Sequence, residues 1–195
     1  MNPQCLSAES IVYSFGAGTD ISFDLGMNQN FGCPVHVFDP TPRSIVWIAE
    51  QALPPKVKFH AYGIGDRDGE ISFYAPRRAS SSHFSPVKRY TDTTDGEMVS
   101  APVLRLSSIL KQLGHTRIDV MKMDIEGGEY DVIADFVGSD IEVDQLLLEF
   151  HHAYATIPLQ KTLDAVQNLR GIGFALFYLS PRTYEMSFIH QRVTA

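Results

Sequence analysis

The chain has few cysteines, no long apolar run and no recognisable targeting pattern in its first residues. Cys5 and Cys33 are too few for a disulfide scaffold, so we interpret them as ordinary thiols in a reducing compartment, with a single bridge as the alternative. No segment approaches the roughly 20 apolar residues that span a bilayer, so no membrane partner is expected. The opening MNPQCLSAES lacks a basic region and an apolar core, so we expect no signal peptide and a cytoplasmic protein.

Basic residues are also scarce. The formal net charge is −7, whereas a general nucleic-acid binder needs clustered Lys and Arg to neutralise phosphates, so no nucleic-acid partner is expected. What is present is the composition of a globular protein, with 44% apolar and 20% charged residues. A chain of 195 residues is long enough for one compact domain with a substantial core, so we expect a single domain over residues 1–195.

Apolar runs alternate with segments of helical spacing. Strands are predicted at residues 11–16, 35–40, 57–65, 69–76, 118–124, 145–152, 173–180 and 184–190. Helices are predicted at residues 21–31, 43–53, 104–114, 128–137 and 158–170. This alternation predicts an α/β fold, in which a mostly parallel sheet carries helices on both faces. The last two strands, separated by Pro181-Arg182-Thr183, predict a closing antiparallel hairpin.

Residues 77–100 interrupt the alternation with a polar stretch rich in Ser and Thr. A loop of this length inside a compact domain is usually functional or disordered. It contains a local positive cluster in an acidic protein, made of Arg77, Arg78, His83, Lys88 and Arg89. We interpret the segment as a substrate loop for an anionic acceptor, with His83 and Arg89 as candidate substrate contacts. A solvated flexible loop is the alternative.

Gly16-Ala17-Gly18 joins the first predicted strand to a helix, which is typical of a turn that lets a ligand approach the backbone. The NAD fingerprint G-x-G-x-x-G needs a third glycine, but Ile21 stands there. Asp20 would also put a carboxylate where a pyrophosphate would bind. A positively charged ligand without phosphate fits better, and S-adenosylmethionine is such a ligand. We expect a bulkier residue at Gly16 or Gly18 to block binding and largely spare the fold; an NAD-dependent oxidoreductase and a plain turn are the alternatives.

The next two strand ends suit a nucleoside. Asp39 ends the second strand, where a carboxylate can accept hydrogen bonds from both ribose hydroxyls; capping of the following helix is the alternative. Gly63 and Ile64 end the third strand and are expected to lie along the adenine together with Tyr62. Asp66 belongs to the same site or to the turn that follows.

Carboxylates gather where the predicted strand at residues 118–124 ends. Asp124 is expected to face the cofactor's ammonium or the acceptor, and Glu126 follows it. Glu129 is interpreted as the acidic start of a helix, favoured by the helix dipole. Lys122 lies inside the apolar strand, so a carboxylate partner is expected if it is buried.

The predicted strand at residues 145–152 ends in LLLEFHH, which places Glu149 and His151 on one face and His152 on the other. His151 is the candidate general base for an acceptor hydroxyl, with a core histidine as the alternative, and Glu149 is a candidate substrate contact. Asp124, Glu126, Glu149 and His151 could together hold Mg²⁺ or Ca²⁺. We nevertheless expect no metal.

Several strings resemble the FkbM-type methyltransferases over about residues 11–190: VYSFGAGTDISFD, VHVFDPTP, GIGDRDG, SSS at 80–82, LSSIL and IDVMKMDIEGGEYDVI. The most specific segment is 122–129, which matches the family pattern K-x-D-x-E-G-x-E, with Gly128 where alanine is common. The string YSFG is also similar to animal methyltransferase-like proteins. The resemblance implies a class I methyltransferase (Rossmann-like) fold with a seven-stranded, mostly parallel sheet. It also implies S-adenosylmethionine as cofactor and O-methylation of a small molecule or sugar.

The expected site residues therefore fall into three groups. They are His151, Asp124 and Glu126 for catalysis; Gly16, Ala17, Gly18, Asp39, Gly63, Ile64 and Asp124 for the cofactor; and His83, Arg89 and Glu149 for the substrate. A non-catalytic nucleotide-binding module of the same fold stays open as an alternative function.

Overall fold

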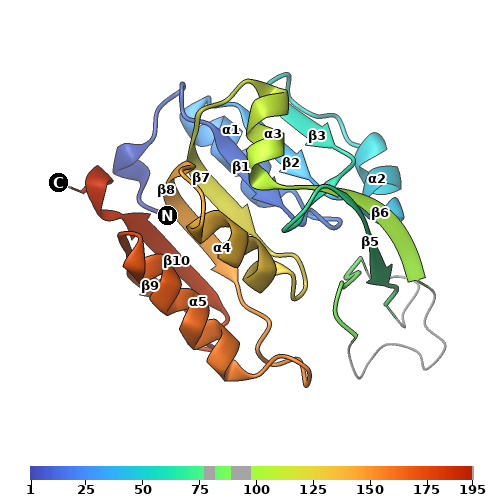
Figure 1. The fold of residues 1–195 in the computed structure, drawn as a ribbon. Coiled ribbons are helices and arrows are strands. Elements are labelled where there is room, and N and C mark those ends of the chain that lie inside the picture. Colours follow the sequence, from blue (N-terminus) through green and yellow to red (C-terminus); the bar gives the residue numbers. More distant parts are fainter. Residues whose placement is uncertain (77–81, 89–97, 195) are drawn as a thin grey trace.

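The computed structural model describes residues 1–76, 82–88 and 98–194, and is built on a seven-stranded sheet (Figure 1). The strand order is β3-β2-β1-β7-β8-β10-β9. The bounds are β1 Val12–Phe15, β2 Val35–Phe38, β3 Val57–His60, β7 Arg117–Met123, β8 Glu142–Glu149, β9 Phe174–Leu179 and β10 Glu185–His190. All neighbours from β3 to β8 pair in parallel, and β10 pairs antiparallel with both β8 and β9. The predicted mostly parallel sheet and the closing antiparallel hairpin are thereby confirmed.

A second, three-stranded sheet has the order β4-β6-β5. Its strands are β4 Gly63–Ile64, β5 Gly69–Tyr74 and β6 Met98–Leu104. The prediction of one strand over residues 57–65 was therefore wrong, because β3 ends at His60 and the chain then leaves the main sheet to pair with β6. The predicted loop also ends earlier than residue 100, since β6 begins at Met98. The apolar pattern of the sequence predicts neither the early end of β3 nor the start of β6, because a short strand has the same pattern in either sheet.

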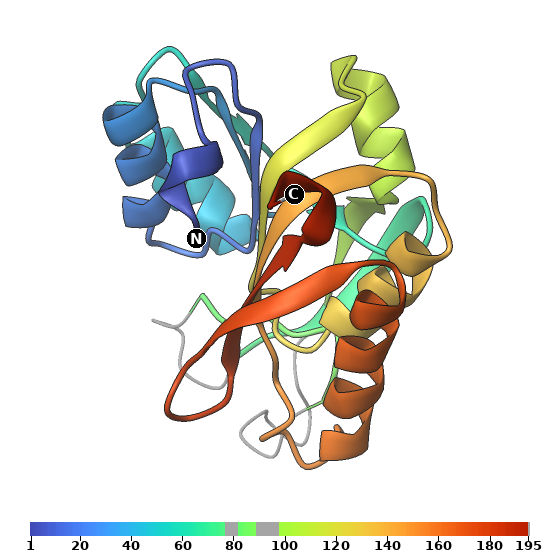
Figure 2. The same ribbon diagram turned by 90° about the vertical axis from the view of Figure 1, so that its left-hand side faces the viewer.

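The helices cover both faces of the main sheet, as predicted (Figure 2). One face carries α1 Ser22–Phe31 and α2 Pro42–Ala49; the other carries α3 Leu106–Leu113, α4 Glu129–Val137 and α5 Leu159–Gly171. Two apolar clusters result, one beneath each set of helices. No helix in the described part of the chain is both long and apolar enough to cross a membrane. Cys5 and Cys33 are both free thiols.

The sheet pairing places polar side chains beneath α1. Strand β1 is buried throughout, because helices cover both of its faces, and its residues alternate between the two apolar clusters. Tyr13 and Phe15 belong to the cluster under α3–α5, whereas Val12 belongs to the cluster under α1 and α2. Ser14 shares the face of Val12 and pairs in register with Lys122 of β7. The carboxyl ends of β1, β2 and β7 therefore meet at one edge, next to the start of α1.

Candidate active site

A pocket of about 860 Å³ opens at the carboxyl ends of β1, β2 and β7. Seven of the residues expected to bind the cofactor line it, namely Gly16, Ala17, Gly18, Asp39, Gly63, Ile64 and Asp124, whereas Tyr62, expected beside the adenine, does not. Glu126 and the candidate substrate residue His83 line the same pocket. Glu149 and His151 are not among its lining residues, and Arg89 lies outside the described residues.

The Gly16–Gly18 turn is tightly packed, as its sequence predicts. Gly16 and Gly18 have φ angles of 86° and 54°, a left-handed region that favours glycine. A Cβ atom on Gly16 would lie 1.7 Å from the carbonyl oxygen of Asp124, whereas one on Gly18 would lie 3.0 Å from Ser82 Oγ. The expectation that a bulkier residue at Gly16 spares the fold was therefore wrong, because that residue would push β1 away from the end of β7.

Asp39 fastens this turn to the start of α2. Its Oδ2 accepts a hydrogen bond from the Gly18 backbone N–H at 2.8 Å. Its Oδ1 accepts from the Thr41 backbone N–H at 2.8 Å and from the Thr41 hydroxyl at 2.6 Å. A carboxylate accepts about four hydrogen bonds, so one position on Oδ2 is left for a further donor. Asp39 thus organises the turn in addition to any contact with a ribose.

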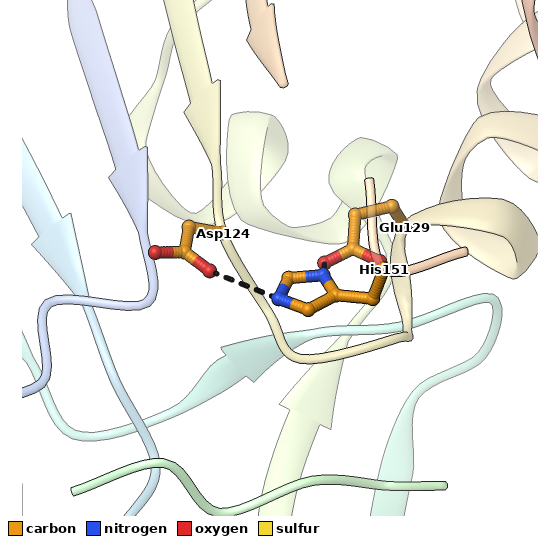
Figure 3. Close-up of side chains that lie close together, drawn as sticks. All are labelled: Asp124, Glu129 and His151. Carbon is orange, nitrogen blue, oxygen red and sulfur yellow. Dashed lines mark ion pairs between the residues drawn. The ribbon is translucent and has the colours of Figure 1, made fainter. Parts of the chain in front are cut away.

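Glu129 is fully buried at the first turn of α4. Its carboxylate accepts from the Ile125 backbone N–H at 2.9 Å and from the Gly127 backbone N–H at 3.1 Å. Its Oε1 also lies 3.0 Å from His151 Nδ1, although the two atoms are not aligned as a hydrogen bond (Figure 3). Glu129 is therefore part of the site's framework, which the sequence interpretation as a plain acidic helix start missed.

His151 lies behind the pocket wall among three carboxylates. Its Nε2 is 3.7 Å from Asp124 Oδ1 and 3.7 Å from Glu126 Oε2 (Figure 3 draws the first of these ion pairs). Burial lowers the pKa of His151, but Glu129, Glu126 and Asp124 together raise it to about 9. At neutral pH the imidazole is therefore protonated, which leaves neither ring nitrogen free to take a proton from an acceptor hydroxyl.

Asp124 has the properties of a proton acceptor. It lies at the tip of β7, lines the pocket, and its side chain is 33% exposed. Burial raises its pKa, and the neighbouring carboxylates of Glu126 and Glu129 raise it further, although Lys122 and His151 act in the opposite direction. A raised pKa makes a carboxylate a stronger base.

Glu126 is held in place from several sides. Its φ of 56° is left-handed, which is uncommon for a residue with a side chain and concentrates at functional sites. Ser85 Oγ donates to the Glu126 carbonyl oxygen at 2.6 Å, and the Tyr154 hydroxyl donates to Glu126 Oε2. His83 Nδ1 contacts Glu126 Oε1. The structure therefore brings His83 to the carboxylate of Glu126, and adds Tyr154 and Ser85, for which no sequence motif provided a signal.

Glu149, the predicted substrate contact, is the last residue of β8 and lies opposite Glu185 of β10. Burial raises its pKa, and Asp124 raises it further. Its carboxylate is thus close enough to influence the site electrostatically without lining the pocket.

Asp124, Glu129 and His151 each offer one ligand atom, and these atoms all lie within 4.8 Å of one another (Figure 3). Such a set can hold a divalent cation, and it differs from the set suggested by the sequence in containing Glu129 in place of Glu149. A protonated His151 provides positive charge at the same position. A proton on His151 and a bound divalent cation are therefore alternative ways to compensate the negative charge of these carboxylates.

Comparisons with known proteins identify the fold and the family of this chain. The fold resembles that of a putative S-adenosylmethionine-dependent methyltransferase from Listeria monocytogenes, with a TM-score of 0.55, 9% identity and coverage of 98% of this chain and 94% of that chain. The chain thus has the class I methyltransferase fold. The family model for the methyltransferase FkbM domain matches residues 18–176, and the chain belongs to this family.

Two curated relatives extend the comparison. Probable methyltransferase-like protein 24 of Homo sapiens is 30% identical over 153 residues, which is 77% of this chain and 33% of that protein. The chain therefore spans about a third of the length of this relative. The 31-O-demethyl-FK506 methyltransferase FkbM of Streptomyces tacrolimicus is 24% identical, over 88% of this chain and 79% of that protein.

The pocket residues fit S-adenosylmethionine. The left-handed glycines bring the backbone close to a ligand, Asp39 has one acceptor position left, and a sulfonium suits a pocket rich in carboxylates. Ile21 stands where the dinucleotide fingerprint has its third glycine, and no cluster of basic side chains marks a diphosphate site among the described lining residues.

Proposed function

We propose that the protein transfers a methyl group from S-adenosylmethionine to a hydroxyl oxygen of a small molecule or glycan. The observation that carries the proposal is one pocket that joins the Gly16–Gly18 turn and Asp39 to Asp124. Membership of the FkbM family supports methyl transfer, and the O-demethyl substrate in the name of the Streptomyces relative supports oxygen as the acceptor atom.

When bound, S-adenosylmethionine supplies an activated methyl group on a sulfonium. The chain's own work is then positioning and removal of one proton. Gly16 and Gly18 admit the ligand to the backbone, while Asp39 keeps their turn in place. Asp124 accepts the proton of the acceptor hydroxyl, and Glu126, held by Tyr154, orients that hydroxyl.

His151 acts in this proposal as a positioning residue behind the wall. Its imidazolium lies between Glu129 on one side and Asp124 and Glu126 on the other. Positive charge at this position lowers the repulsion between the two pocket carboxylates and fixes their orientation. The proposal therefore transfers the role of general base from His151 to Asp124.

The charge of the pocket favours a neutral acceptor. Among its described lining residues, carboxylates outnumber the cationic side chains of Arg67 and Lys122. An anionic acceptor, including a nucleic acid, would meet repulsion there. The alternative of an anion-recognising loop depends on Arg77, Arg78 and Arg89, which lie outside the described residues.

The test is S-adenosylhomocysteine release by the full chain, incubated with methyl-labelled S-adenosylmethionine and a panel of glycans, polyketides, phenols and RNA. We expect release, and label on oxygen, with at least one neutral hydroxyl compound. Tight cofactor binding without transfer to any acceptor would favour a non-catalytic module, and label on RNA alone would overturn the acceptor class.

A further inference from the structure

Asp24 is a buried carboxylate of α1 that the mechanism above does not use. It is 2% exposed, yet it borders the pocket beside the Gly16–Gly18 turn. Its Oδ1 has no well-aligned hydrogen-bond partner among the residues that the structure describes. Ser14 Oγ beneath it is close enough to lower the pKa of Asp24, but it is not aligned as a hydrogen bond either. Native proteins seldom leave a buried carboxylate oxygen without a well-aligned donor, so Oδ1 can accept a hydrogen bond from a ligand.

Lys122 supplies the opposite charge in the same place. It pairs in register with Ser14 and also lines the pocket. Within residues 1–76, 82–88 and 98–194 it forms no hydrogen bond or ion pair, although its charge lowers the pKa values of Asp24 and Asp124. The carboxylate partner expected from the sequence is therefore near Lys122 without touching it.

Keeping Asp24 ionised in this position is unfavourable without a ligand. Burial raises the pKa of Asp24 to about 6, even though Ser14 and Lys122 lower it. An uncompensated buried charge costs free energy that only a good partner offsets. A cationic donor that enters the pocket would meet both the unsatisfied Oδ1 and this charge.

We propose that Asp24 and Lys122 bind the α-amino-acid end of S-adenosylmethionine, with Asp24 accepting from its ammonium and Lys122 pairing with its carboxylate. The inference rests on the proposed function. It follows from two opposite charges that line one pocket and form no ion pair among the described residues, which together complement a zwitterion. Asp39, fastened to the other side of the glycine turn, is left for the uncharged ribose.

Three ligands separate the parts of this site when binding is measured by titration calorimetry on the full chain. S-adenosylmethionine carries both charged groups of the amino-acid end, its decarboxylated form keeps the ammonium but not the carboxylate, and 5′-methylthioadenosine lacks both of them and the sulfonium as well. Asp24→Asn is the first variant and should fold, because burial already favours a neutral side chain there. Lys122→Met is the second, and Asp164→Asn on the exposed face of α5 is the matched control.

Asp24→Asn should weaken both charged ligands at least tenfold and change 5′-methylthioadenosine by less than threefold. Lys122→Met should weaken S-adenosylmethionine selectively over its decarboxylated form. An equal loss for all three ligands in Asp24→Asn would overturn the inference while leaving the proposed function intact. If the wild-type chain bound none of them, the proposed function would fail as well.

Discussion

Glu129 and His151 form an ion pair inside the protein, with 3.0 Å between Oε1 and Nδ1. The pair joins the first turn of α4 to the segment that follows β8. Because Glu129 also holds the backbone between β7 and α4, its contact with His151 sets where Asp124 and Glu126 can lie. An arrangement of this kind predicts effects on stability as well as on turnover.

The first prediction concerns pH. Since the pKa of His151 is raised to about 9 in the folded state, its stabilising effect is complete below about pH 6.5, the ordinary histidine value, and is lost as pH rises through 9. The difference in unfolding free energy between wild type and His151→Asn should therefore shrink by about 3 kcal/mol between pH 6 and pH 10. Urea unfolding across this range measures it.

The control is His152→Asn, because His152 contacts Thr162 instead of a carboxylate. If His152→Asn showed the same pH dependence, or if His151→Asn showed none, the buried ion pair would not be the cause.

The second prediction concerns the glycine turn. Gly16→Ala should lower the unfolding free energy by at least roughly 3 kcal/mol, because its Cβ would meet the Asp124 carbonyl oxygen at 1.7 Å in a left-handed conformation. Gly26→Ala is the matched control: nothing lies within 4 Å of its Cβ, and alanine should stabilise the middle of α1 by about 0.5–1 kcal/mol. Thermal unfolding that ranked the two variants equally would contradict the packing seen at Gly16.

The order of strands and helices could be predicted largely from sequence, because both signals are local. Alternation of apolar runs with helical spacing identified the seven strands of the main sheet and its covering helices. The small sheet was missed because the pairing of Gly63–Ile64 with β6 joins segments far apart in the chain. Periodicity carries no information about such partners.

At the site, the sequence identified the residues but not which of them contact one another. Strand ends marked the Gly16–Gly18 turn, Asp39 and Asp124, which the structure brings to one pocket. The role of His151 could not be read, because its protonation depends on three carboxylates that converge only in the fold. Tyr154 carried no signal for the same reason, since its contact with Glu126 is long-range.

The third prediction tests Asp124 as the base. Asp124→Asn should lower kcat by roughly 10²–10⁴-fold while the affinity for S-adenosylhomocysteine changes little, because the amide cannot accept the proton. In wild type, kcat should fall as pH drops through the raised pKa of Asp124. Equal turnover in Asp124→Asn and wild type, measured as S-adenosylhomocysteine release, would remove Asp124 from this role.

The fourth prediction concerns metal ions. A protonated His151 already balances Asp124 and Glu129, so dialysis against EDTA should leave both the melting temperature and methyl transfer unchanged. A drop in either quantity that Mg²⁺, Mn²⁺ or Zn²⁺ restored would show that a cation occupies this cluster.

The most direct measurement is calorimetric titration of the full chain with S-adenosylhomocysteine and, separately, with NAD. The account predicts saturable binding of S-adenosylhomocysteine and none of NAD. In Asp39→Ala the binding free energy of S-adenosylhomocysteine should weaken by roughly 1–3 kcal/mol, because the hydrogen bond to the Gly18 backbone N–H and a ribose contact are both removed. Binding of NAD in place of S-adenosylhomocysteine, or full affinity in Asp39→Ala, would contradict it.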